Sequence, residues 1–523
     1  MSILRRVLVF VLRTSSRLLL AVIRLISFFS GNPPPVSPPR DPLLLTPASV
    51  LADRIRRGEV KSSVVVQSFI SRIREVNPTI NALVCDRFEE ALREAKAVDD
   101  LVSSGTQDER TLKENYPLLG VPLSVKEAFA LQGMPNSSGL LSRRSLRSET
   151  DAAVVSRLKR AGAIPLGVTN CSELCMWYES SNNIYGQSRN PYNPQHIVGG
   201  SSGGEGSIIG SGGSVIGVGS DIGGSIRMPA YFNGIYGHKP TSGIVPNEGQ
   251  FPNAHGCRTE LLCTGPMCRY AADLPLVLKV MAGKNVEKLS LEKEVSLRSL
   301  RFFSMENDGG CLFVSPVDKE LVQVQRRVVK HLEDKLGVSV QAINIHNLRY
   351  SFQIWSAAMS SDGDKEQSFT ELMADGNSMW PSFELVKWMF GLSKHTLPAI
   401  GLALTEKLAN LNPEGNAKMI QKAKNLKDEI NSLLGDDGIL LYPSHPKIAP
   451  KHNEPIAMPF NFAYTGIFNV LGVPVTQCPL GLSEGGLPLG IQIISSQHND
   501  HLTLALAQYL ESSLVGWTPP GCI

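Results

Sequence analysis

Two serines lie in a glycine-rich stretch that runs from Gly199 to Ala230, Ser201 within GGSSGG and Ser225 within DIGGSIR. A serine hydroxyl is a weak nucleophile until a base removes its proton. Histidine, the commonest base, is absent from this stretch. The many glycines indicate a backbone that lies close to a neighbour or directs several N–H groups at one point. The stretch therefore favours nucleophilic chemistry with an unusual base.

Three other interpretations of the stretch remain open from the residues alone. Residues 199–203 formally match the G-x-S-x-G nucleophile elbow, which requires an acidic residue and then a histidine downstream. His445, His452 and His498 are candidates, but nothing around them resembles a triad loop. A phosphate-binding loop is the second alternative, although its G-K-[ST] ending is missing. A purely structural glycine-rich loop is the third.

Three motifs together resemble the amidase-signature family. They are the stretch itself, PLSVKEAF around Lys126, and HKPTSGIVP beginning at His238. The likeness continues through GPM at Gly265 and LPLGIQI at Leu487, and it covers roughly residues 43–510. Within the family the chain is most similar to the fatty-acid amide hydrolases of the lipid-droplet-associated type. The resemblance implies an α/β fold with a large mixed central β-sheet surrounded by many α-helices.

The resemblance also implies a catalytic role for each of three side chains. Ser225 matches the nucleophile, Ser201 the bridging serine on a cis peptide bond, and Lys126 the base. The motif is specific, because Lys126 precedes Ser201 by 75 residues and Ser225 follows 24 residues later. The alternative for Lys126 is a lysine at a strand end that reaches solvent.

The implied relay is chemically coherent if the lysine is uncharged. The ordinary pKa of a lysine is about 10.4, so the side chain is protonated at neutral pH. Burial disfavours the ammonium form, and a shift of ~3 units corresponds to about 4 kcal/mol. Lys126 would then take the proton of Ser201 while Ser201 takes that of Ser225, and the reverse path would protonate the leaving amine.

The loop before Ser225 is the expected oxyanion hole, since glycines allow backbone donors to converge on one oxygen. The expected donors are the N–H groups of Ile222, Gly223, Gly224 and Ser225. Asp221 and Arg227 flank this loop, and we expect them to pair and brace it. Glu127 follows the base and would face the opposite side of a strand, so we expect it to have a supporting role.

Alternating strands and helices must position these groups. The pattern predicts strands within residues 118–129, 163–170, 438–444 and 486–496. It predicts helices over residues 47–57, 88–101, 154–161, 275–281, 319–335, 406–434 and 502–510, and another that starts at Ser62 or Ser63 and ends before Pro78. Such alternation favours one mixed or mostly parallel sheet covered by helices.

The N-terminal segment has the pattern of a membrane anchor. Arg6, Arg13, Arg17 and Arg24 would share one face of a helix, with apolar residues around the rest of the circumference. This favours a helix in the plane of the membrane, with a tilted span or a targeting peptide as alternatives. We therefore predict an anchoring helix at residues 1–30, a proline-rich linker at 31–42 and a catalytic domain at 43–518.

Charge and cysteine usage exclude other classes of protein. Without the five arginines of residues 1–30, 46 basic and 48 acidic side chains remain, so the body has no basic footprint for nucleic acid. The nine cysteines are scattered, and we expect mostly reduced thiols. Cys171 and Cys175 could share a helix face, but no histidine lies near them in sequence. We predict no metal site and no cofactor.

An apolar region between Trp355 and Leu397 is the candidate acyl-binding part of the chain. Three of the five tryptophans lie there. The region could form ordinary helix core, or an acyl channel with a second membrane contact at residues 383–392. The predicted substrate-binding residues are Met176, Trp177, Trp380 and Phe383, of which the first two resemble acyl-contacting positions of the relatives.

Together with the N-terminal segment and the apolar region, the resemblance implies a membrane-associated serine hydrolase that cleaves lipid amides to free fatty acid and amine. The expected substrates are primary amides such as oleamide and N-acylethanolamines such as anandamide, and the expected location is the endoplasmic reticulum or lipid-droplet surface. An amidase for soluble amides or glutamine, as in the amidotransferase A subunit, is the first alternative. A catalytically inactive, membrane-tethered lipid-binding protein is the second. Whether the chain forms a homodimer stays open.

Overall fold

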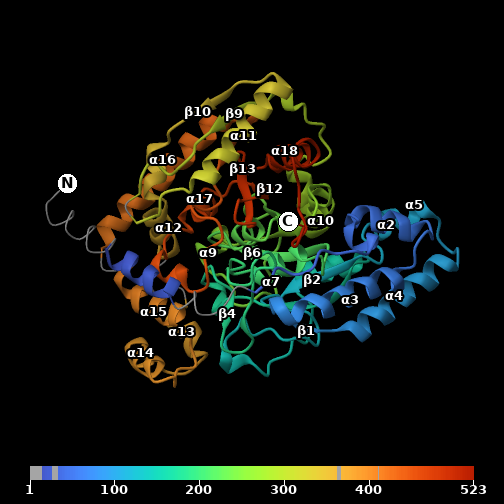
Figure 1. Ribbon diagram of the computed structural model, residues 1–523, viewed down its shortest axis with the longest axis horizontal. Coiled ribbons are helices and arrows are strands. Elements are labelled where there is room, and N and C mark those ends of the chain that lie inside the picture. Colours follow the sequence, from blue (N-terminus) through green and yellow to red (C-terminus); the bar gives the residue numbers. More distant parts are fainter. Residues whose placement is uncertain (1–13, 26–32, 312, 362–366, 410–411, 523) are drawn as a thin grey trace.

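A mixed sheet of eleven strands forms the centre of the computed structural model, which describes residues 14–25, 33–311, 313–361, 367–409 and 412–522. Helices surround this sheet (Figure 1), which confirms the predicted fold class. In sheet order the strands are β1 (Leu83–Asp86), β3 (Ile164–Thr169), β2 (Pro122–Lys126), β6 (Ile216–Asp221), β8 (Cys263–Cys268), β7 (Tyr236–Lys239), β12 (Val475–Leu482), β13 (Pro488–Ile494), β11 (Gly438–Tyr442), β9 (Arg301–Ser304) and β10 (Val340–Ala342).

The strands that carry the candidate residues lie deep in this sheet. β2 pairs in parallel with β3 on one side and with β6 on the other, and β6 pairs antiparallel with β8. Every residue of β2, β6 and β8 is buried, as expected for strands covered on both faces. Polar groups on these strands are therefore removed from water unless they bond to one another.

Most predicted helices are present with small shifts in their ends. The helices of the body are α2 (Ala48–Arg56), α3 (Ser62–Ile80), α4 (Phe88–Ser103), α5 (Glu109–Asn115), α6 (Ala153–Arg160), α7 (Gly203–Gly210), α8 (Arg227–Phe232), α9 (Arg258–Leu261), α10 (Leu274–Ala282), α11 (Lys319–Leu336), α12 (Ser351–Met359), α13 (Phe369–Ala374), α14 (Pro381–Met389), α15 (Leu397–Ala409), α16 (Pro413–Leu434), α17 (Ala463–Leu471) and α18 (Asp500–Ser513).

Two helix predictions were wrong in detail. α3 continues through Pro78 to Ile80, because the buried Ile80 packs in the core and a proline in the last turn removes only one helical hydrogen bond. The single helix predicted over residues 406–434 is two helices. Asn412 caps the second, accepting from Gly415 N–H at 2.9 Å, and Pro413 starts it, as proline commonly does at the first helical position.

The described part of the N-terminal segment is a helix over residues 14–25. Its apolar side chains at Leu18, Val22 and Leu25 are exposed, and Arg24 Nε lies 2.7 Å from Glu454 Oε1. Arg6 and Arg13 of the predicted arginine face lie outside the described residues. Among the described helices, none has both the length and the apolar composition that a bilayer crossing requires.

The proline-rich segment is not a free linker, so the predicted boundary at residue 43 is corrected. Val36 is buried, and its N–H donates to Pro191 C=O at 3.0 Å. The guanidinium of Arg72 donates to Ser37 C=O at 2.5 Å. Burying Val36 stabilises the extended chain against the body, and the folded unit therefore begins within the segment.

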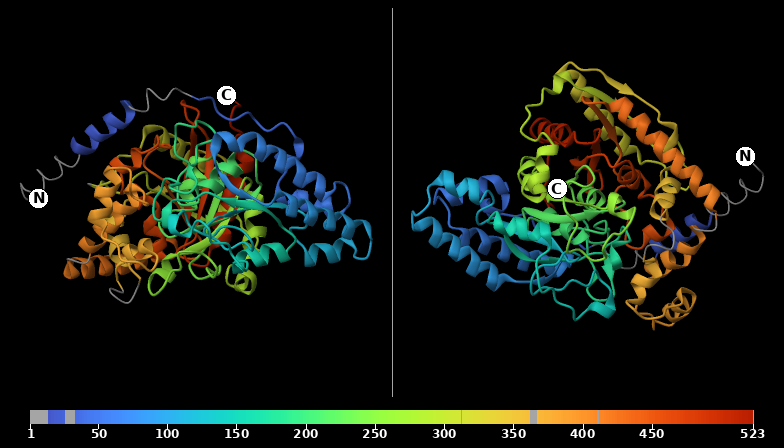
Figure 2. Two further views of the ribbon diagram at one scale, coloured as in Figure 1. Left: turned by 90° about the horizontal axis from the view of Figure 1, so that it is seen from below. Right: turned by 180° about the vertical axis from the view of Figure 1, so that it is seen from behind.

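α13, α14 and α15 form one corner of the molecule. Figures 1 and 2 place this corner and the helix over residues 14–25 at the end opposite to α2–α5. α14 presents many large apolar side chains to solvent. The exposed ones at this helix and beside it are Trp380, Phe383, Val386, Trp388, Met389, Phe390 and Leu392.

Candidate active site

Lys126 lies at the end of β2, fully buried between two hydroxyl groups. Its Nζ is 2.7 Å from Ser201 Oγ and 2.9 Å from Ser220 Oγ. The alternative of a lysine that reaches solvent is therefore wrong. The amine is therefore shielded from bulk solvent, and its nitrogen is within proton-transfer distance of Ser201.

The two predicted serines lie in neighbouring loops, Ser201 just before α7 and Ser225 just before α8. Ser201 follows a cis peptide bond from Gly200, as the resemblance implied. Ser202 N–H donates to Ser225 C=O at 3.2 Å, which ties the two serine loops together. Ser225 is 8% exposed and Ser201 1%. The Ser225 hydroxyl has no recorded hydrogen bond among the described residues, so it is available to a substrate.

A buried ion pair holds the loop before Ser225, as predicted. The guanidinium of Arg227 donates to both carboxylate oxygens of Asp221, at 2.9 and 3.0 Å, and both side chains are fully buried. Arg227 and the N–H of Ile226 keep the pKa of Asp221 well below its usual range, despite the opposing effect of burial. Arg227 also donates to Thr465 C=O and to the side chains of Gln492 and Asn469. Such a satisfied bidentate pair is a rigid brace.

One of the four predicted oxyanion donors is already used. Gly224 N–H donates to Asp221 Oδ1 at 2.7 Å, so its inclusion in the oxyanion hole is corrected. The reason is electrostatic, because a carboxylate within reach attracts the nearest backbone donor. The N–H groups of Ile222, Gly223 and Ser225 have no recorded partner within the described part of the chain. Three donors therefore remain for a developing oxyanion.

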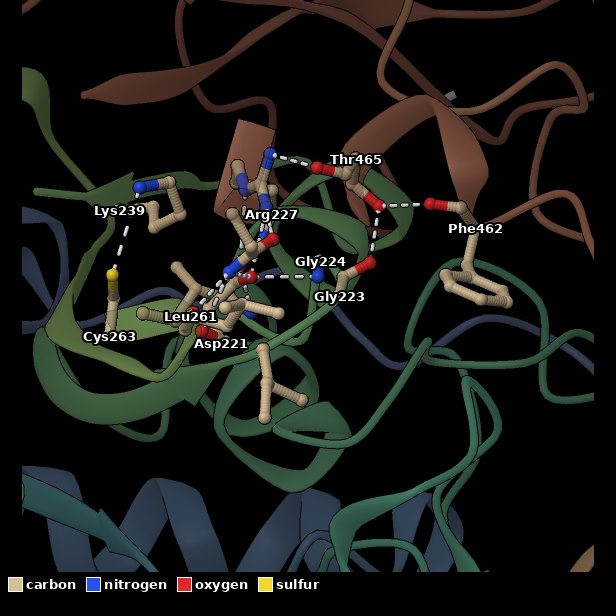
Figure 3. Close-up of polar contacts among 12 residues, drawn as sticks. Asp221, Gly223, Gly224, Arg227, Lys239, Leu261, Cys263, Phe462 and Thr465 are labelled. Carbon is tan, nitrogen blue, oxygen red and sulfur yellow. Dashed lines mark hydrogen bonds and ion pairs between the residues drawn. The ribbon is translucent and has the colours of Figure 1, made fainter. Parts of the chain in front are cut away.

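The carbonyl groups of the same loop are held from outside it. Trp355 Nε1 on α12 donates to Ile222 C=O at 2.8 Å, and Thr465 Oγ1 on α17 lies 2.7 Å from Gly223 C=O. Figure 3 shows Thr465 between the carbonyl groups of Gly223 and Phe462. A side chain at Gly224 would collide with Thr465, and its φ of +120° suits glycine.

Two further polar groups near Lys126 were missed by the sequence analysis. Ser220 lies on β6, the strand beside β2, and a correct pairing of these two strands would have found it. Glu205 on α7 accepts from Ser124 Oγ at 2.6 Å and from Thr169 Oγ1 at 2.8 Å. Burial raises the pKa of Glu205 to about 8, although these bonds and the nearby Lys126 lower it. The carboxyl is therefore mostly neutral at pH 7.

Cys171 and Cys175 do not share a helix face. Leu174 and Cys175 both have left-handed backbone conformations, which ends the short helical turn at Cys175. The Cys175 thiol contacts Cys171, Ser201 and Ser138. Its bond to Cys171, the nearby Lys126 and its bonds to the two serines lower the pKa of this thiol, against the effect of burial. Within the described ranges, no group of three or more histidine, cysteine or acidic side chains has the geometry of a metal site.

Two further predictions concern Glu127, which was expected to have a supporting role, and the histidines, which were candidates for the catalytic base. Glu127 accepts from the N–H groups of Ser137 and Ser138 at 2.8 and 2.6 Å, as expected for a supporting carboxylate. His452 bonds to Glu179 and to a backbone carbonyl, and His445 bonds to the backbone of Lys447. No recorded hydrogen bond of the described chain joins a histidine to Ser201 or Ser225, so the structure does not support a nucleophile elbow.

The predicted substrate residues fall into two places. The backbone of Trp177 lies against Gly200, beside Ser201, and Met176 packs on the apolar cluster of α13 and α15. Trp380 and Phe383, in contrast, are 76% and 59% exposed. For these two side chains the expectation of ordinary helix core is wrong, because they lie on the surface.

Comparisons with known proteins agree with this geometry. Residues 64–504 match the family described as Amidase. The chain is 56% identical to fatty-acid amide hydrolase 2 of Homo sapiens over 498 residues, covering 94% of this chain and 93% of that protein. It is 58% identical to fatty-acid amide hydrolase 2-A of Danio rerio over 492 residues, covering 93% and 92%. A solved fatty acid amide hydrolase has the same fold, with a TM-score of 0.71, 23% identity and coverage of 91% and 86%.

Proposed function

The chain belongs to the amidase family and is an amide-hydrolysing enzyme, and we propose that it cleaves fatty-acid amides through Ser225, Ser201 and Lys126. The single observation that carries the catalytic part is the buried Lys126 amine 2.7 Å from Ser201 Oγ. The lipid part is supported by the likeness to the two fatty-acid amide hydrolase 2 proteins and by the exposed apolar face of α14.

In the proposed acylation step, Ser225 Oγ attacks the amide carbonyl carbon. Ser201 Oγ takes the proton of Ser225, and Lys126 Nζ takes the proton of Ser201. The same path in reverse delivers a proton to the nitrogen of the leaving amine, which breaks the C–N bond and leaves an ester on Ser225. Lys126, acting through Ser201, then takes a proton from the water that attacks the ester. The proton returns to Ser225 Oγ as the acyl C–O bond breaks, and the free acid leaves.

The free N–H groups of Ile222, Gly223 and Ser225 would stabilise the negative oxygen of the tetrahedral intermediate. Removing one such donor typically costs about 2.7–4 kcal/mol in barrier height. The donors are held before substrate arrives, since Arg227 and Asp221 brace the loop at its end. The site needs no metal or organic cofactor in this proposal, because its own side chains supply the base and the electrostatic stabilisation.

We further propose that the enzyme works at a membrane or lipid-droplet surface, such as that of the endoplasmic reticulum. α14 and the helix over residues 14–25 both present apolar side chains, and both lie at the same end of the molecule (Figures 1 and 2). A lipid amide partitioned in the bilayer would reach the enzyme at that end. Burying one large apolar side chain is worth about 1.5–3 kcal/mol, so a few of them suffice for reversible binding.

The proposal is tested by substrate choice. Purified full-length protein is given oleamide and anandamide in phosphatidylcholine vesicles, and in parallel glutamine and a short arylamide in buffer. We expect kcat/KM to be at least about 100-fold higher for the lipid amides. Turnover of glutamine or the arylamide alone would replace the lipid assignment with a soluble-substrate amidase. Absence of turnover with all four would favour the inactive lipid-binding protein.

A further inference from the structure

We propose that Trp355 is a positioning residue for the oxyanion hole, because its indole N–H holds the Ile222 carbonyl and thereby aims the Gly223 N–H at the reacting oxygen. This inference rests on the proposed function. It assigns the orientation of one oxyanion donor to a tryptophan that lies 133 residues after Ile222 in the chain. Its basis is the 2.8 Å bond from Trp355 Nε1 to Ile222 C=O.

The carbonyl of Ile222 and the N–H of Gly223 belong to one peptide group. That peptide bond is trans, since the recorded cis bonds lie elsewhere. In a trans peptide the C=O and N–H vectors point in nearly opposite directions. A donor that fixes the carbonyl on one side therefore fixes the N–H on the other. The Gly223 N–H must point away from Trp355, and it has no recorded partner within the described residues.

The Ile222 carbonyl needs such a bond from outside the loop, which we call a carbonyl clamp. The loop contains Gly223 and Gly224 in succession, and glycines resist peptide rotation less than any other residues. Without an external bond, the Ile222–Gly223 peptide could turn its N–H away from the substrate at little cost. The neighbouring peptide shows the outcome of a different clamp, because Thr465 holds Gly223 C=O while Gly224 N–H faces Asp221. Each carbonyl clamp thus decides where the next N–H points.

Trp355 is itself held in place. Its ring meets Phe462 edge-to-face with centroids 4.8 Å apart, and a side chain at Gly466 would approach the indole to 3.1 Å. α12, which carries Trp355, packs along α17, which carries Thr465 and Gly466. The two clamps therefore come from one packed pair of helices, and the indole has little freedom to swing away from Ile222.

The test compares two tryptophans, each of which donates its indole N–H to a backbone carbonyl. Trp355→Phe removes the indole donor at Ile222, and Trp517→Phe removes an indole donor that bonds to Gly210 C=O at 3.0 Å. Both changes delete one N–H and retain an aromatic ring. We measure kcat and KM on oleamide vesicles and the rate at which a fluorophosphonate labels Ser225.

We expect Trp355→Phe to lower kcat by about 10- to 100-fold with KM changed less than 3-fold, somewhat below the loss for deleting a whole oxyanion donor. The labelling rate should fall by a similar factor, since phosphonylation also builds charge on the oxyanion. Trp517→Phe should change both rates less than 2-fold. Unchanged rates in Trp355→Phe, or equal losses in both variants, would overturn the inference.

A second replacement at Trp355 separates loss of the N–H donor from any change in side-chain packing. Substituting 3-benzothienylalanine for Trp355 keeps the shape of the indole and replaces only its N–H by sulfur. The same fall in kcat is expected, and a fully active protein would overturn the inference even if Trp355→Phe folds poorly. If the wild-type protein neither hydrolyses oleamide nor is labelled, the proposed function itself fails. If the wild type is active and both variants match it, only the role of Trp355 fails.

Discussion

The buried centre around Ser225 and the exposed helix α14 are built on opposite principles. In the centre, Asp221, Arg227 and Lys126 are fully buried, and each bonds to several named partners. On α14, Trp380 is 76% exposed and Met389 70%. The charged side chains of the centre all have internal bonds, whereas the helix offers apolar surface that no part of the described chain covers.

This contrast separates catalysis from access to substrate. Changes in the centre break bonds that set geometry or charge, so they should lower kcat or the free energy of unfolding. Changes to the exposed apolar side chains of α14 remove few internal contacts, such as that of Lys387 with the Phe383 ring, so they should leave the fold intact and alter the supply of lipid substrate. Each prediction below tests one side of the comparison.

The largest effect is expected at the nucleophile. Ser225→Ala should lower kcat/KM at least about 10⁴-fold on every amide, because loss of the nucleophile in a serine protease costs about 10⁶-fold. The midpoint of urea unfolding should change little, since the Ser225 hydroxyl has no recorded bond to lose. Steady-state hydrolysis of oleamide and of a short arylamide provides the measurement. Retained activity on either substrate would show that another group attacks.

The second prediction concerns stability in the centre. Asp221→Asn leaves the fully buried Arg227 without a charged partner, so the free energy of unfolding should fall by about 3–5 kcal/mol. Urea denaturation followed by circular dichroism measures the change. Arg110 and Glu114 form an exposed pair at 2.9 Å, and Glu114→Gln as a control should cost less than about 1 kcal/mol. Equal effects of the two changes would refute the idea of a buried brace.

The third prediction tests the surface helix. Replacing Trp380, Phe383 and Phe390 together by serine should raise KM for oleamide in vesicles about 10-fold or more, because each buried ring contributes about 1.5–3 kcal/mol to membrane binding. kcat on a short soluble arylamide and the unfolding midpoint should stay within error. A matched control is serine at Val50 and Val64, exposed apolar residues on α2 and α3 at the opposite end. A similar rise in KM for the control would contradict a specific role of α14 in membrane binding.

The last prediction is a pH dependence of the free energy of unfolding that arises from Glu205. Its pKa is raised to about 8 in the fold, above the ordinary value of 4.5, so between these values the native state holds more protons than the unfolded chain. The free energy of unfolding should therefore fall as pH rises from 5 to 8, by up to about 1.4 kcal/mol per unit from this group.

Glu205→Gln isolates that contribution, because a neutral amide has no proton to lose. The difference in unfolding free energy between wild type and variant, measured in urea at pH 5, 6, 7 and 8, should shift steadily against the wild type as pH rises. A difference that stays constant over this range would mean that Glu205 does not titrate as inferred.

Much of the centre could be predicted from sequence because its signals are local. The glycine-rich stretch, the flanking Asp221 and Arg227, and the segment with Lys126 each lie within a few residues of a motif. Ser220 and Glu205 were missed because their roles depend on which strands lie side by side, and sequence alone gave no register for β2 and β6.

The roles of the carbonyl clamps and of the surface helix α14 were harder to predict from sequence, for a different reason. Trp355 and Thr465 act through bonds to loop carbonyls more than 130 residues away, and apolar residues on α12 and α17 look like ordinary core. The use of Gly224 N–H by Asp221 depends on the turn geometry of the loop rather than on residue type. On α14, the same apolar composition suited core and surface alike, and only the fold placed it at the outside.

The most direct test of the account is to map the residue that a fluorophosphonate modifies. After reaction at pH 7.5, digestion and mass spectrometry should find the phosphonyl group on Ser225, and Lys126→Ala should slow that labelling at least about 100-fold because the base is lost. Label on Ser201, or labelling that proceeds equally well without Lys126, would contradict catalysis by a buried lysine acting through two serines.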